Sequence, residues 1–471
     1  MVLSETKPTI LARPWLIGLT AAASIGLSSC NQPVSVLQQV KDSKRLVVVT
    51  RNSPTTYYEG SEGLAGLEYE LVKRFADSLN VELNLIVEEN LKEIIPMTAR
   101  GGVHFAAAGL TVTEARKKMV RFSEPYQDVK QQLVYRAGSK KPRSIKDIRE
   151  KKLAVVAGSS HAEVLTELQN RHDDLSWEES QSHDNEELLD LVWQKQLDLT
   201  VADSNTVILN RRAYPELRIA FDLTKPEPLA WAFPRTHDNS LYKAANAFIK
   251  SMKDSGELGQ LIERYYGHLD DFDYVETKRF NAHRVERLPE FEPIFIQAGA
   301  RYGVDWQLLA AIGYQESHWL PKAKSPTGVR GIMMLTRDTA NHLGVESRLD
   351  PMQSIWGGAR YFSEIKQQLK ASAEEPDLTW LALAAYNIGI GHLKDVQILA
   401  QERGGDPNKW IDVKEALPLL QQQRWHTTTR HGYARGREAV TYVTNVRKYY
   451  DQLQQLYSPL HAASVEFKEA S

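Results

Sequence analysis

The first half of the chain alternates between short apolar runs and longer amphipathic segments. Residues 46–50 form a β-branched run bounded by polar residues, which predicts a buried strand. Residues 67–79 place Leu71, Phe75 and Leu79 at i, i+4 and i+8, which predicts a helix with one apolar face. Alternating strands and helices favour a parallel α/β sheet, and the length of this half fits two lobes. Further strands are expected at 81–87, 105–108, 132–135, 153–157, 197–202 and 229–233.

After residue 267 the β-branched alternation stops, and the apolar positions recur at helical spacing. The junction at 268–290 is charged and shows no enrichment in proline, glycine or serine, so we expect it to be ordered and packed. The patterns therefore predict a multidomain chain, with a two-lobed α/β part followed by a mainly α part. Helices are expected at 291–302, 306–319, 337–343, 351–369, 378–388, 391–401 and 436–456.

The composition is that of a globular protein of two to four domains. The 471 residues are 42% hydrophobic and 25% charged, which excludes a disordered or collagen-like chain. With 58 Lys and Arg against 60 Asp and Glu, no excess of positive charge indicates nucleic-acid binding. A single Cys cannot form an internal disulfide or a thiolate zinc site, and His161, His172 and His183 lack metal-ligand spacing. We therefore expect no metal and no cofactor.

The N-terminus has the pattern of an export signal. Lys7 and Arg13 precede an apolar run at 15–27, which is too short to span a bilayer. The run ends in Leu-Ser-Ser-Cys at 27–30, which resembles a bacterial lipobox with Cys30 as the acylated residue. We expect residues 1–30 to be a signal peptide and the mature chain to be anchored at the periplasmic face of the outer membrane. Alternatively, Cys30 is incidental and the attachment is peripheral.

Six segments of the first half together resemble the solute-binding protein family 3. They are Gly-Leu-Glu-Tyr-Glu-Leu at 66–71, Gly-Leu-Thr-Val-Thr-Glu-Ala-Arg-Lys-Lys at 109–118, Phe-Ser-Glu-Pro-Tyr at 122–126, Val-Ala-Gly-Ser-Ser at 156–160, Val-Ala-Asp-Ser at 201–204 and Glu-Arg-Tyr-Tyr-Gly at 263–267. The resemblance covers residues 43–268. It implies a periplasmic-binding-protein-like regulatory domain, assigned here to 31–269, that closes on an amino acid or cell-wall peptide.

The residues of these segments suit a ligand that carries a carboxylate and an ammonium. Arg116 can clamp a carboxylate with two hydrogen bonds, and Asp203 can accept the ammonium. The Thr111 hydroxyl, the Gly109 backbone and the N–H groups of the helix start at Ser159 and Ser160 can complete the site. Alternatively, Arg116 only pairs with Glu114 or Asp128 at the surface.

In the second half, the chemistry centres on a carboxylate that ends an apolar stripe. Leu308, Ile312 and Glu316 lie on one helical face, so the Glu316 carboxyl should be partly desolvated. Desolvation raises the pKa of a carboxyl group, as a general acid near neutral pH requires. A glycine-punctuated turn with Met333 and Met334 follows at 325–335, and Ala-Ala-Tyr-Asn-Ile-Gly at 384–389 ends another helix.

Glu-Ser, Gly-x-x-Gly-Ile-Met-Met and Ala-Tyr-Asn-x-Gly, in this order, resemble the soluble-lytic-transglycosylase (SLT) domain, which has a lysozyme-like fold. The resemblance covers 290–450, within a catalytic domain assigned to 270–471, and residues 438–450 match its last helix. It implies that Glu316 is the catalytic acid. The residues that it assigns to sugar positioning are Ser317, Ser325, Met333, Met334, Tyr386, Asn387 and Tyr442. Met334 stands where the family commonly has Gln, and Met333 and Met334 fit a core position equally well.

The resemblance implies a lyase that cleaves peptidoglycan between N-acetylmuramic acid and N-acetylglucosamine and leaves 1,6-anhydromuramyl ends. Regulation by a ligand of the first domain is our hypothesis for the fusion. Two alternatives stay open. One is a hydrolase with a second acid such as Glu364 or Asp338. The other is a solute receptor whose C-terminal domain only binds peptidoglycan.

Overall fold

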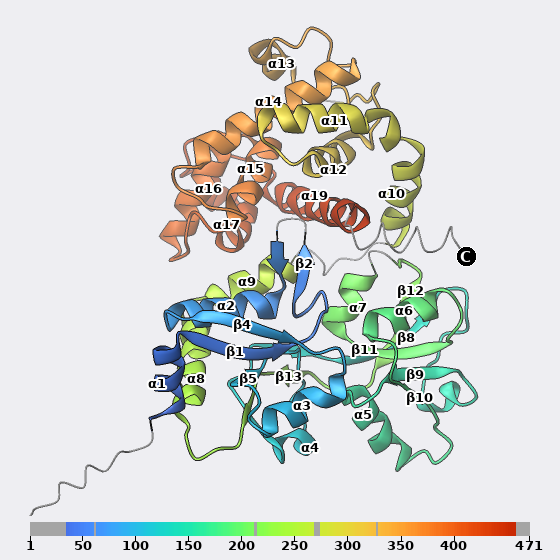
Figure 1. The fold of residues 1–471 in the computed structure, drawn as a ribbon. Helices are drawn as coiled ribbons and strands as arrows, with labels where there is room; N and C mark the ends of the chain where they lie inside the picture. Colours follow the sequence, from blue (N-terminus) through green and yellow to red (C-terminus); the bar gives the residue numbers. More distant parts are fainter. Residues whose placement is uncertain (1–33, 61–62, 212–213, 268–273, 326–327, 458–471) are drawn as a thin grey trace, which may run out of the picture.

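A computed structural model describes residues 34–60, 63–211, 214–267, 274–325 and 328–457. Figure 1 shows an α/β part that ends at residue 267 and a helical part that begins at residue 274. The predicted signal peptide and Cys30 lie outside the described residues. Within the described ranges, no helix is both long and apolar enough to cross a membrane.

The first lobe of the α/β part is built on a five-stranded sheet with the order β4-β1-β5-β14-β6. Trp231 is fully buried in this lobe and stacks on Phe105 at 5.0 Å between ring centroids. Its strands are β1 (Arg45–Thr50), β4 (Glu82–Val87), β5 (Phe105–Ala106), β6 (Val120–Phe122) and β14 (Ala232–Pro234), with a hairpin of β2 (Tyr58–Gly60) and β3 (Gly63–Ala65). Its helices are α1 (Val36–Ser43), α2 (Leu67–Ser78), α3 (Leu91–Ala99), α4 (Glu114–Lys117), α8 (Ser240–Asp254) and α9 (Glu257–Tyr266).

The second lobe is built on a sheet with the order β10-β9-β11-β8-β12. Two short strands, β7 (Gln127–Val129) and β13 (Glu227–Leu229), pair antiparallel where the chain passes between the lobes. The strands of the second sheet are β8 (Gln131–Arg136), β9 (Leu153–Val156), β10 (Glu178–Ser180), β11 (Leu199–Asp203) and β12 (Leu217–Asp222). The helices are α5 (Ser160–Gln169), α6 (Asn185–Trp193), α7 (Ser204–Asn210) and the 3-10 turn η1 (Ile145–Ile148).

The prediction of parallel sheets is correct for β1 with β4 and β5, and for β9 with β10 and β11. It is wrong for β8, β12 and β14, which pair antiparallel. The strand predicted at 229–233 is in fact two strands, β13 and β14. The physical reason is that the chain crosses between the lobes twice, so the returning segment enters each sheet against the direction of its neighbours.

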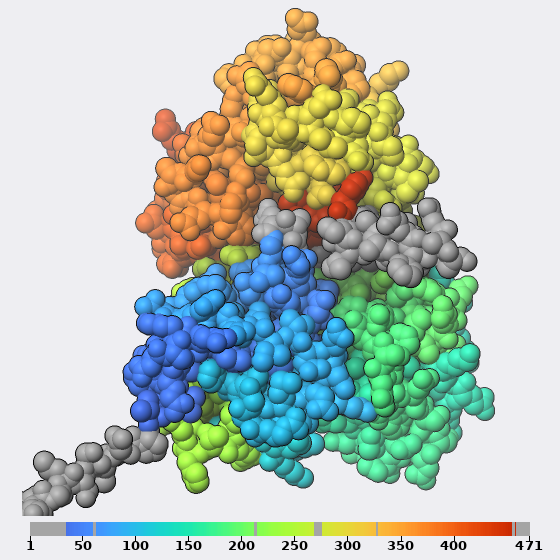
Figure 2. Space-filling model, viewed as in Figure 1, coloured from blue at the N-terminus to red at the C-terminus, as the bar shows by residue number. Residues whose placement is uncertain are grey.

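The helical part has one large core, and the predicted helices are found within three residues of their expected bounds. α19 packs against α12 and α15, and Figure 2 shows part of it between the two parts of the molecule. The main helices are α11 (Leu288–Tyr302), α12 (Trp306–Ser317), α13 (Arg337–Leu343), α14 (Pro351–Leu369), α15 (Asp377–Ile388), α16 (Ile390–Glu402) and α19 (Gly436–Leu456). The sequence did not predict α10 (Tyr274–Glu286), α17 (Trp410–Ala416), η2 (Leu417–Gln421) and α18 (Gln423–His426).

Arg447 of α19 joins the helical part to the end of α9. One guanidinium nitrogen donates to Glu263 Oε1 at 2.8 Å, and the other donates to the backbone carbonyls of Glu263 and Arg264 at 3.1 and 3.0 Å. The guanidinium also lies 4.7 Å from the ring centroid of Trp380 in α15. Because a helix C-terminus attracts cations, the end of α9 suits this buried arginine. The contact fixes α19 and α15 against the first lobe.

Candidate functional site

Glu316 lies in the last turn of α12, which begins at an N-cap where the Asp305 side chain accepts from the Gln307 N–H. The Glu316 carboxyl is half-buried, and its Oε1 accepts a hydrogen bond of 2.7 Å from the Tyr442 hydroxyl. Burial raises the pKa of Glu316 to about 7, although the Tyr442 hydrogen bond lowers it. A carboxyl group with this pKa is in part protonated at neutral pH and can donate a proton.

Tyr386 is a second phenol beside this carboxyl. Its hydroxyl donates to the Met333 carbonyl at 3.0 Å, which fixes the ring at the end of α15. Burial and the nearby charge of Glu316 raise the pKa of Tyr386 well above its ordinary value. The next residue, Asn387, is exposed. The Ala-Tyr-Asn segment therefore presents one side chain near the acid and one toward solvent.

A pocket of about 390 Å³ lies next to Glu316: its chain neighbour Gln315 and its hydrogen-bond partner Tyr442 line the pocket, whereas Glu316 itself does not. Asn387 and Tyr442, two of the predicted positioning residues, line it. The sequence had marked the last helix through its resemblance at 438–450, but it gave no signal for the other lining residues. These are Gln315, Arg437, Glu438 and Thr441.

The glycine-containing turn at 325–335 packs against α12. Gly331 has a φ of +84°, and a Cβ there would lie 1.7 Å from the Arg348 carbonyl oxygen, so only glycine fits. The Ser317 hydroxyl bonds to the Gly313 and Ile332 carbonyls at 3.1 and 2.9 Å and ties α12 to this turn. The buried Ser317 therefore serves the packing of α12.

The other predicted positioning residues lie in the same turn. Met333 is fully buried, so it occupies the core position that the sequence had left open and its side chain does not line the pocket. Met334 is half-buried with a φ of +46°. The Ser325 hydroxyl is half-buried and accepts from the Val329 N–H at 3.2 Å.

Neither of the two candidates for the second acid of a hydrolase, Glu364 and Asp338, lines the pocket next to Glu316. Glu364 pairs with Arg360 at 2.9 Å and with His342 at 3.3 Å. Asp338 lies in the first turn of α13 and is exposed. Glu438 does line the pocket, but no carboxylate of the described residues is among the causes that shift the pKa of Glu316.

In the α/β part, Arg116 joins the two lobes. Its Nε donates to Glu163 of the second lobe at 2.9 Å, and its terminal nitrogens donate to the carbonyls of Thr111 and Gly158, both at 3.3 Å. The carboxylate on Arg116 is thus Glu163, rather than the Glu114 that the surface alternative suggested, and Glu114 pairs with Lys117. The guanidinium is buried and directed at the second lobe.

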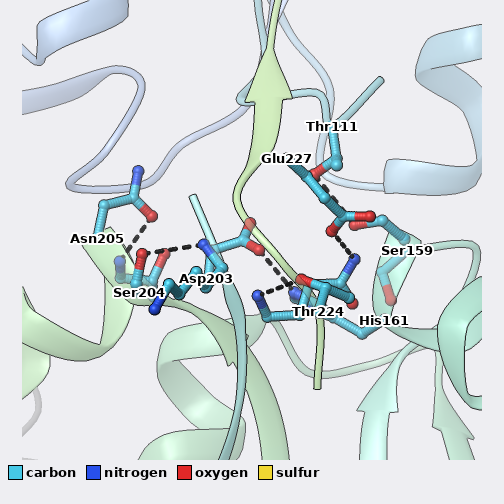
Figure 3. Close-up of polar contacts among 12 residues, drawn as sticks. Thr111, Ser159, His161, Asp203, Ser204, Asn205, Thr224 and Glu227 are labelled. Atoms are coloured by element: carbon cyan, nitrogen blue, oxygen red, sulfur yellow. Dashed lines mark hydrogen bonds and ion pairs between the residues drawn. The ribbon is translucent and has the colours of Figure 1, made fainter. Parts of the chain in front are cut away.

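Four other predicted ligand residues are buried around the same cleft. The Ser160 hydroxyl donates to the Thr111 hydroxyl across the lobes at 3.3 Å, and the Ser159 side chain caps α5 by accepting from the Ala162 N–H. Asp203 Oδ1 lies 3.3 Å from His161 Nε2. Figure 3 shows Thr111 near Ser159, with Asp203 and His161 in the same view.

The sequence predicts that the Gly109 backbone helps to bind the ligand. In the structure the Gly109 N–H donates to Glu68 Oε2 at 2.6 Å. Glu68 is buried, which raises its pKa to about 7, and it also accepts from the Tyr126 hydroxyl at 2.8 Å. Across the lobes, the Ser53 hydroxyl donates to Glu186 at 2.8 Å. Sequence reasoning gave no role to Glu163, Glu186 or Ser53, since each acts through a contact between distant segments.

Comparison with known families agrees with this division. Residues 46–268 match bacterial extracellular solute-binding proteins, family 3, and residues 293–409 match the transglycosylase SLT domain. The protein is therefore an enzyme of the transglycosylase class that carries a solute-binding domain ahead of its catalytic domain. The chain is also similar to the crystal structure of a mutant of ArgBP from T. maritima, with 25% identity and a TM-score of 0.45 over 49% of this chain and 99% of that one.

Curated relatives extend the match across both domains. The chain is 52% identical over 429 residues to membrane-bound lytic murein transglycosylase F 1 of Alkalilimnicola ehrlichii, covering 91% of this chain and 87% of that one. It is 48% identical over 453 residues to membrane-bound lytic murein transglycosylase F of Saccharophagus degradans, covering 95% and 90%. The chain belongs to the membrane-bound lytic murein transglycosylase F family.

Proposed function

We propose that Glu316 is the acid and then the base of a non-hydrolytic cleavage of peptidoglycan. The observation that carries the proposal is the half-buried Glu316 carboxyl, with a pKa of about 7, held by Tyr442 beside a pocket. Glycosidases that hydrolyse their substrate usually need two flanking carboxylates. A transglycosylase needs only one, because the substrate supplies the nucleophile.

In the proposed reaction, protonated Glu316 donates its proton to the glycosidic oxygen between N-acetylmuramic acid and N-acetylglucosamine. The C1–O bond breaks, and the muramyl N-acetyl group stabilises the developing oxocarbenium ion. The Glu316 carboxylate then takes the proton of the muramyl C6 hydroxyl while O6 bonds to C1. The products are a 1,6-anhydromuramyl end and a free 4-hydroxyl on N-acetylglucosamine, and no water is consumed.

Mass spectrometry of the fragments released from purified sacculi tests this reaction. The expected fragments are lighter by one water than hydrolytic ones, and Glu316→Gln abolishes their release while keeping the fold. Glu438→Gln, which removes the carboxylate that lines the pocket, should keep both the product and at least about a third of the rate. Reducing ends would indicate a hydrolase, and absence of any release would favour the receptor alternative.

We further propose that an amino acid or cell-wall peptide binds between the lobes of the first domain. Its carboxylate would replace Glu163 on Arg116, and Asp203 would accept its ammonium. Both groups are buried, and a charged ligand group that pairs with them would be strongly oriented. The presence of Glu163 on Arg116 supports an exchange of one carboxylate for another at the same guanidinium.

A series of contacts supports a connection from this cleft to α9. Glu68, which holds the Gly109 N–H, lies in α2. Glu70 of the same helix bonds to Arg264 at 2.7 Å and to the Tyr265 hydroxyl at 2.5 Å, both in α9. A movement of the loop at Gly109 would therefore be transmitted to α9 through α2.

The series continues into the catalytic domain. Glu263 of α9 holds Arg447 of α19, and Tyr442 of α19 holds Glu316. In the proposed regulation, ligand binding changes the position of α19 and with it the rate of cleavage. Because a continuous series of contacts does not by itself establish coupling, the test must compare the protein with and without ligand.

The test compares cleavage rates with and without saturating cell-wall peptide. We expect a change of at least about five-fold, which is the lower end of ordinary coupling energies. Arg447→Lys should keep peptide binding but remove most of the rate change, because a lysine ammonium cannot contact three acceptors in the same geometry. An unchanged rate with bound peptide would exclude regulation through this domain.

The membrane attachment implied by the relatives' names is proposed to occur at the outer membrane, through a lipid on Cys30. Cys30→Ala should then release the chain from washed membranes into the soluble fraction. Retention of this variant on the membrane would favour peripheral attachment instead.

A further inference from the structure

A second and larger pocket lies between the α/β part and the helical part. Its volume is about 650 Å³, within the range of small-molecule sites. In Figure 1, α9 lies below α17 and α19, and the residues of this pocket come from these three helices and from η2. They are Gly259, Ile262, Glu263, Gly267, Ile411, Lys414, Glu415, Pro418, Arg437, Val440 and Thr441.

This interdomain pocket adjoins the pocket beside Glu316. Arg437 and Thr441, one turn apart on α19, line both of them. A molecule that occupies the catalytic pocket can therefore extend along the same face of α19 into the interdomain pocket. If the proposed function holds and a sugar lies in the first pocket, the second is placed for a substituent of that sugar.

The charges of the interdomain pocket suit a ligand that carries both signs. Glu263 is already neutralised, since Arg447 and Lys414 contact it at 2.8 and 3.6 Å. Arg437 and Glu415 are both exposed, and neither forms an ion pair with a residue that the structure describes. One cation and one anion thus remain available, between the apolar walls that Ile262, Ile411, Pro418 and Val440 provide.

Gly259 keeps the pocket open on the α9 side. It lies inside a helix, where glycine costs roughly 1 kcal/mol relative to alanine. A Cβ added at Gly259 would meet no atom within 4 Å, so the packing of α9 does not require glycine there. Because Gly259 lines the pocket and a Cβ there meets open space, we expect a larger side chain at this position to occupy part of the pocket.

We propose that the interdomain pocket binds the acidic peptide attached to the muramyl residue whose bond is cleaved. This inference rests on the proposed function, since it assumes that the muramyl sugar lies beside Glu316. Such a peptide carries several carboxylates, a side-chain amine and the methyl groups of alanine. Arg437 binds a carboxylate, Glu415 binds the amine, and the apolar walls contact the methyl groups.

The pocket therefore makes the enzyme selective for strands that still carry their peptides. The test measures binding by the full chain with Glu316→Gln, so that the strands stay intact. The probes are glycan strands with their peptides and the same strands after enzymatic removal of the peptides. We expect the peptide-bearing strands to bind about ten-fold more tightly.

Gly259→Leu and Arg437→Gln should each bring this ratio of affinities close to one. Matched controls are Gln260→Leu on the same helix and Arg435→Gln on the same segment, because neither residue lines the pocket. Equal affinities in the parent would overturn the proposal. So would a ratio that survives both pocket variants, which is also what peptide capture in the distant Arg116 cleft would give.

Failure of the proposed function would be visible separately. It would appear as hydrolytic fragments from the chain with Glu316 intact, whatever the ratio of binding affinities. The ratio of binding affinities therefore tests the peptide pocket, and the mass of the products tests the proposed reaction independently.

Discussion

The Tyr442 hydroxyl donates to Glu316 at 2.7 Å. This bond joins α19 to α12 through two residues that are 126 positions apart in sequence. In the reaction that we propose, this donor would stabilise the carboxylate once the proton has left. The bond also fixes the orientation of the carboxyl group. The geometry of Glu316 thus depends on how α19 packs against α12.

Tyr442→Phe should lower the cleavage rate about ten-fold at pH 6, because the carboxyl group loses its fixed orientation. The Tyr442 bond lowers the pKa of Glu316, so its loss should raise that pKa further. The alkaline decline of the rate then moves to higher pH, which a pH–rate profile would show. Tyr450→Phe is the matched control, since Tyr450 lies on the same helix as Tyr442 and its hydroxyl donates to Asp305, the N-cap of α12, at 2.6 Å. Identical pH profiles for the parent and Tyr442→Phe would contradict the prediction.

Glu316→Gln should stabilise the fold at pH 8 but have little effect at pH 4. The folded pKa of about 7 lies above the ordinary value of 4.5, so the native state keeps a proton that the unfolded state releases between these values. Stability is therefore lost as the pH rises from about 4.5 to about 7, and the glutamine variant avoids this loss. Urea unfolding midpoints at the two pH values measure it. A variant that gains equally at both would show that ionisation is not the cause.

Arg447→Met should destabilise the protein by about 3 kcal/mol, because it removes one member of a buried pair and leaves two backbone carbonyls without their donor. The shift of the urea midpoint is the measurement. Lys414→Met is the control, with an expected loss below about 1 kcal/mol, since Lys414 is partly exposed and lies 3.6 Å from the same carboxylate. Equal losses of unfolding free energy from the two variants would show that Arg447 contributes no more to the interface than Lys414 does.

Glu163→Gln should tighten binding of the first-domain ligand several-fold, whereas Arg116→Gln should weaken it at least about a hundred-fold. The reason is that Glu163 competes with the ligand carboxylate for the same guanidinium. Calorimetric titration with a cell-wall tripeptide would measure both effects. Glu167→Gln, one turn further along α5 and exposed, controls for the loss of negative charge. Weaker binding by Glu163→Gln would mean that Glu163 contacts the ligand instead of competing with it.

The sequence predicted the helical part better than the α/β part, for a physical reason. A long helix such as α14 repeats its apolar period many times, so its bounds could be assigned from sequence. Short strands such as β5 carry little periodic information, and their direction depends on where the chain crosses between lobes. The charged segment of α10 has no clear apolar face, so its sequence predicts an ordered junction but not a helix.

The candidate site shows the same limit. Glu316 and Tyr386 stand in local motifs that the sequence displays. The pairing of Arg116 with Glu163 spans 47 residues, and the sequence offered the nearer Glu114 and Asp128 instead. Such contacts are set by packing between segments, which a single sequence does not encode in any local pattern.

α19 runs without interruption from Gly436 to Leu456, and Arg447 stands five residues after Tyr442 on it. At 1.5 Å per residue, the two side chains are about 7.5 Å apart along the helix axis. Because an uninterrupted helix is stiff along its axis, an axial displacement of α19 at Arg447 would move Tyr442 by nearly the same distance. A hydrogen bond of 2.7 Å is lost beyond about 3.5 Å, so a slide of roughly 1 Å is enough to free the carboxyl group. In the regulation that we propose, such a slide alone would switch the enzyme, and no helix would need to unfold.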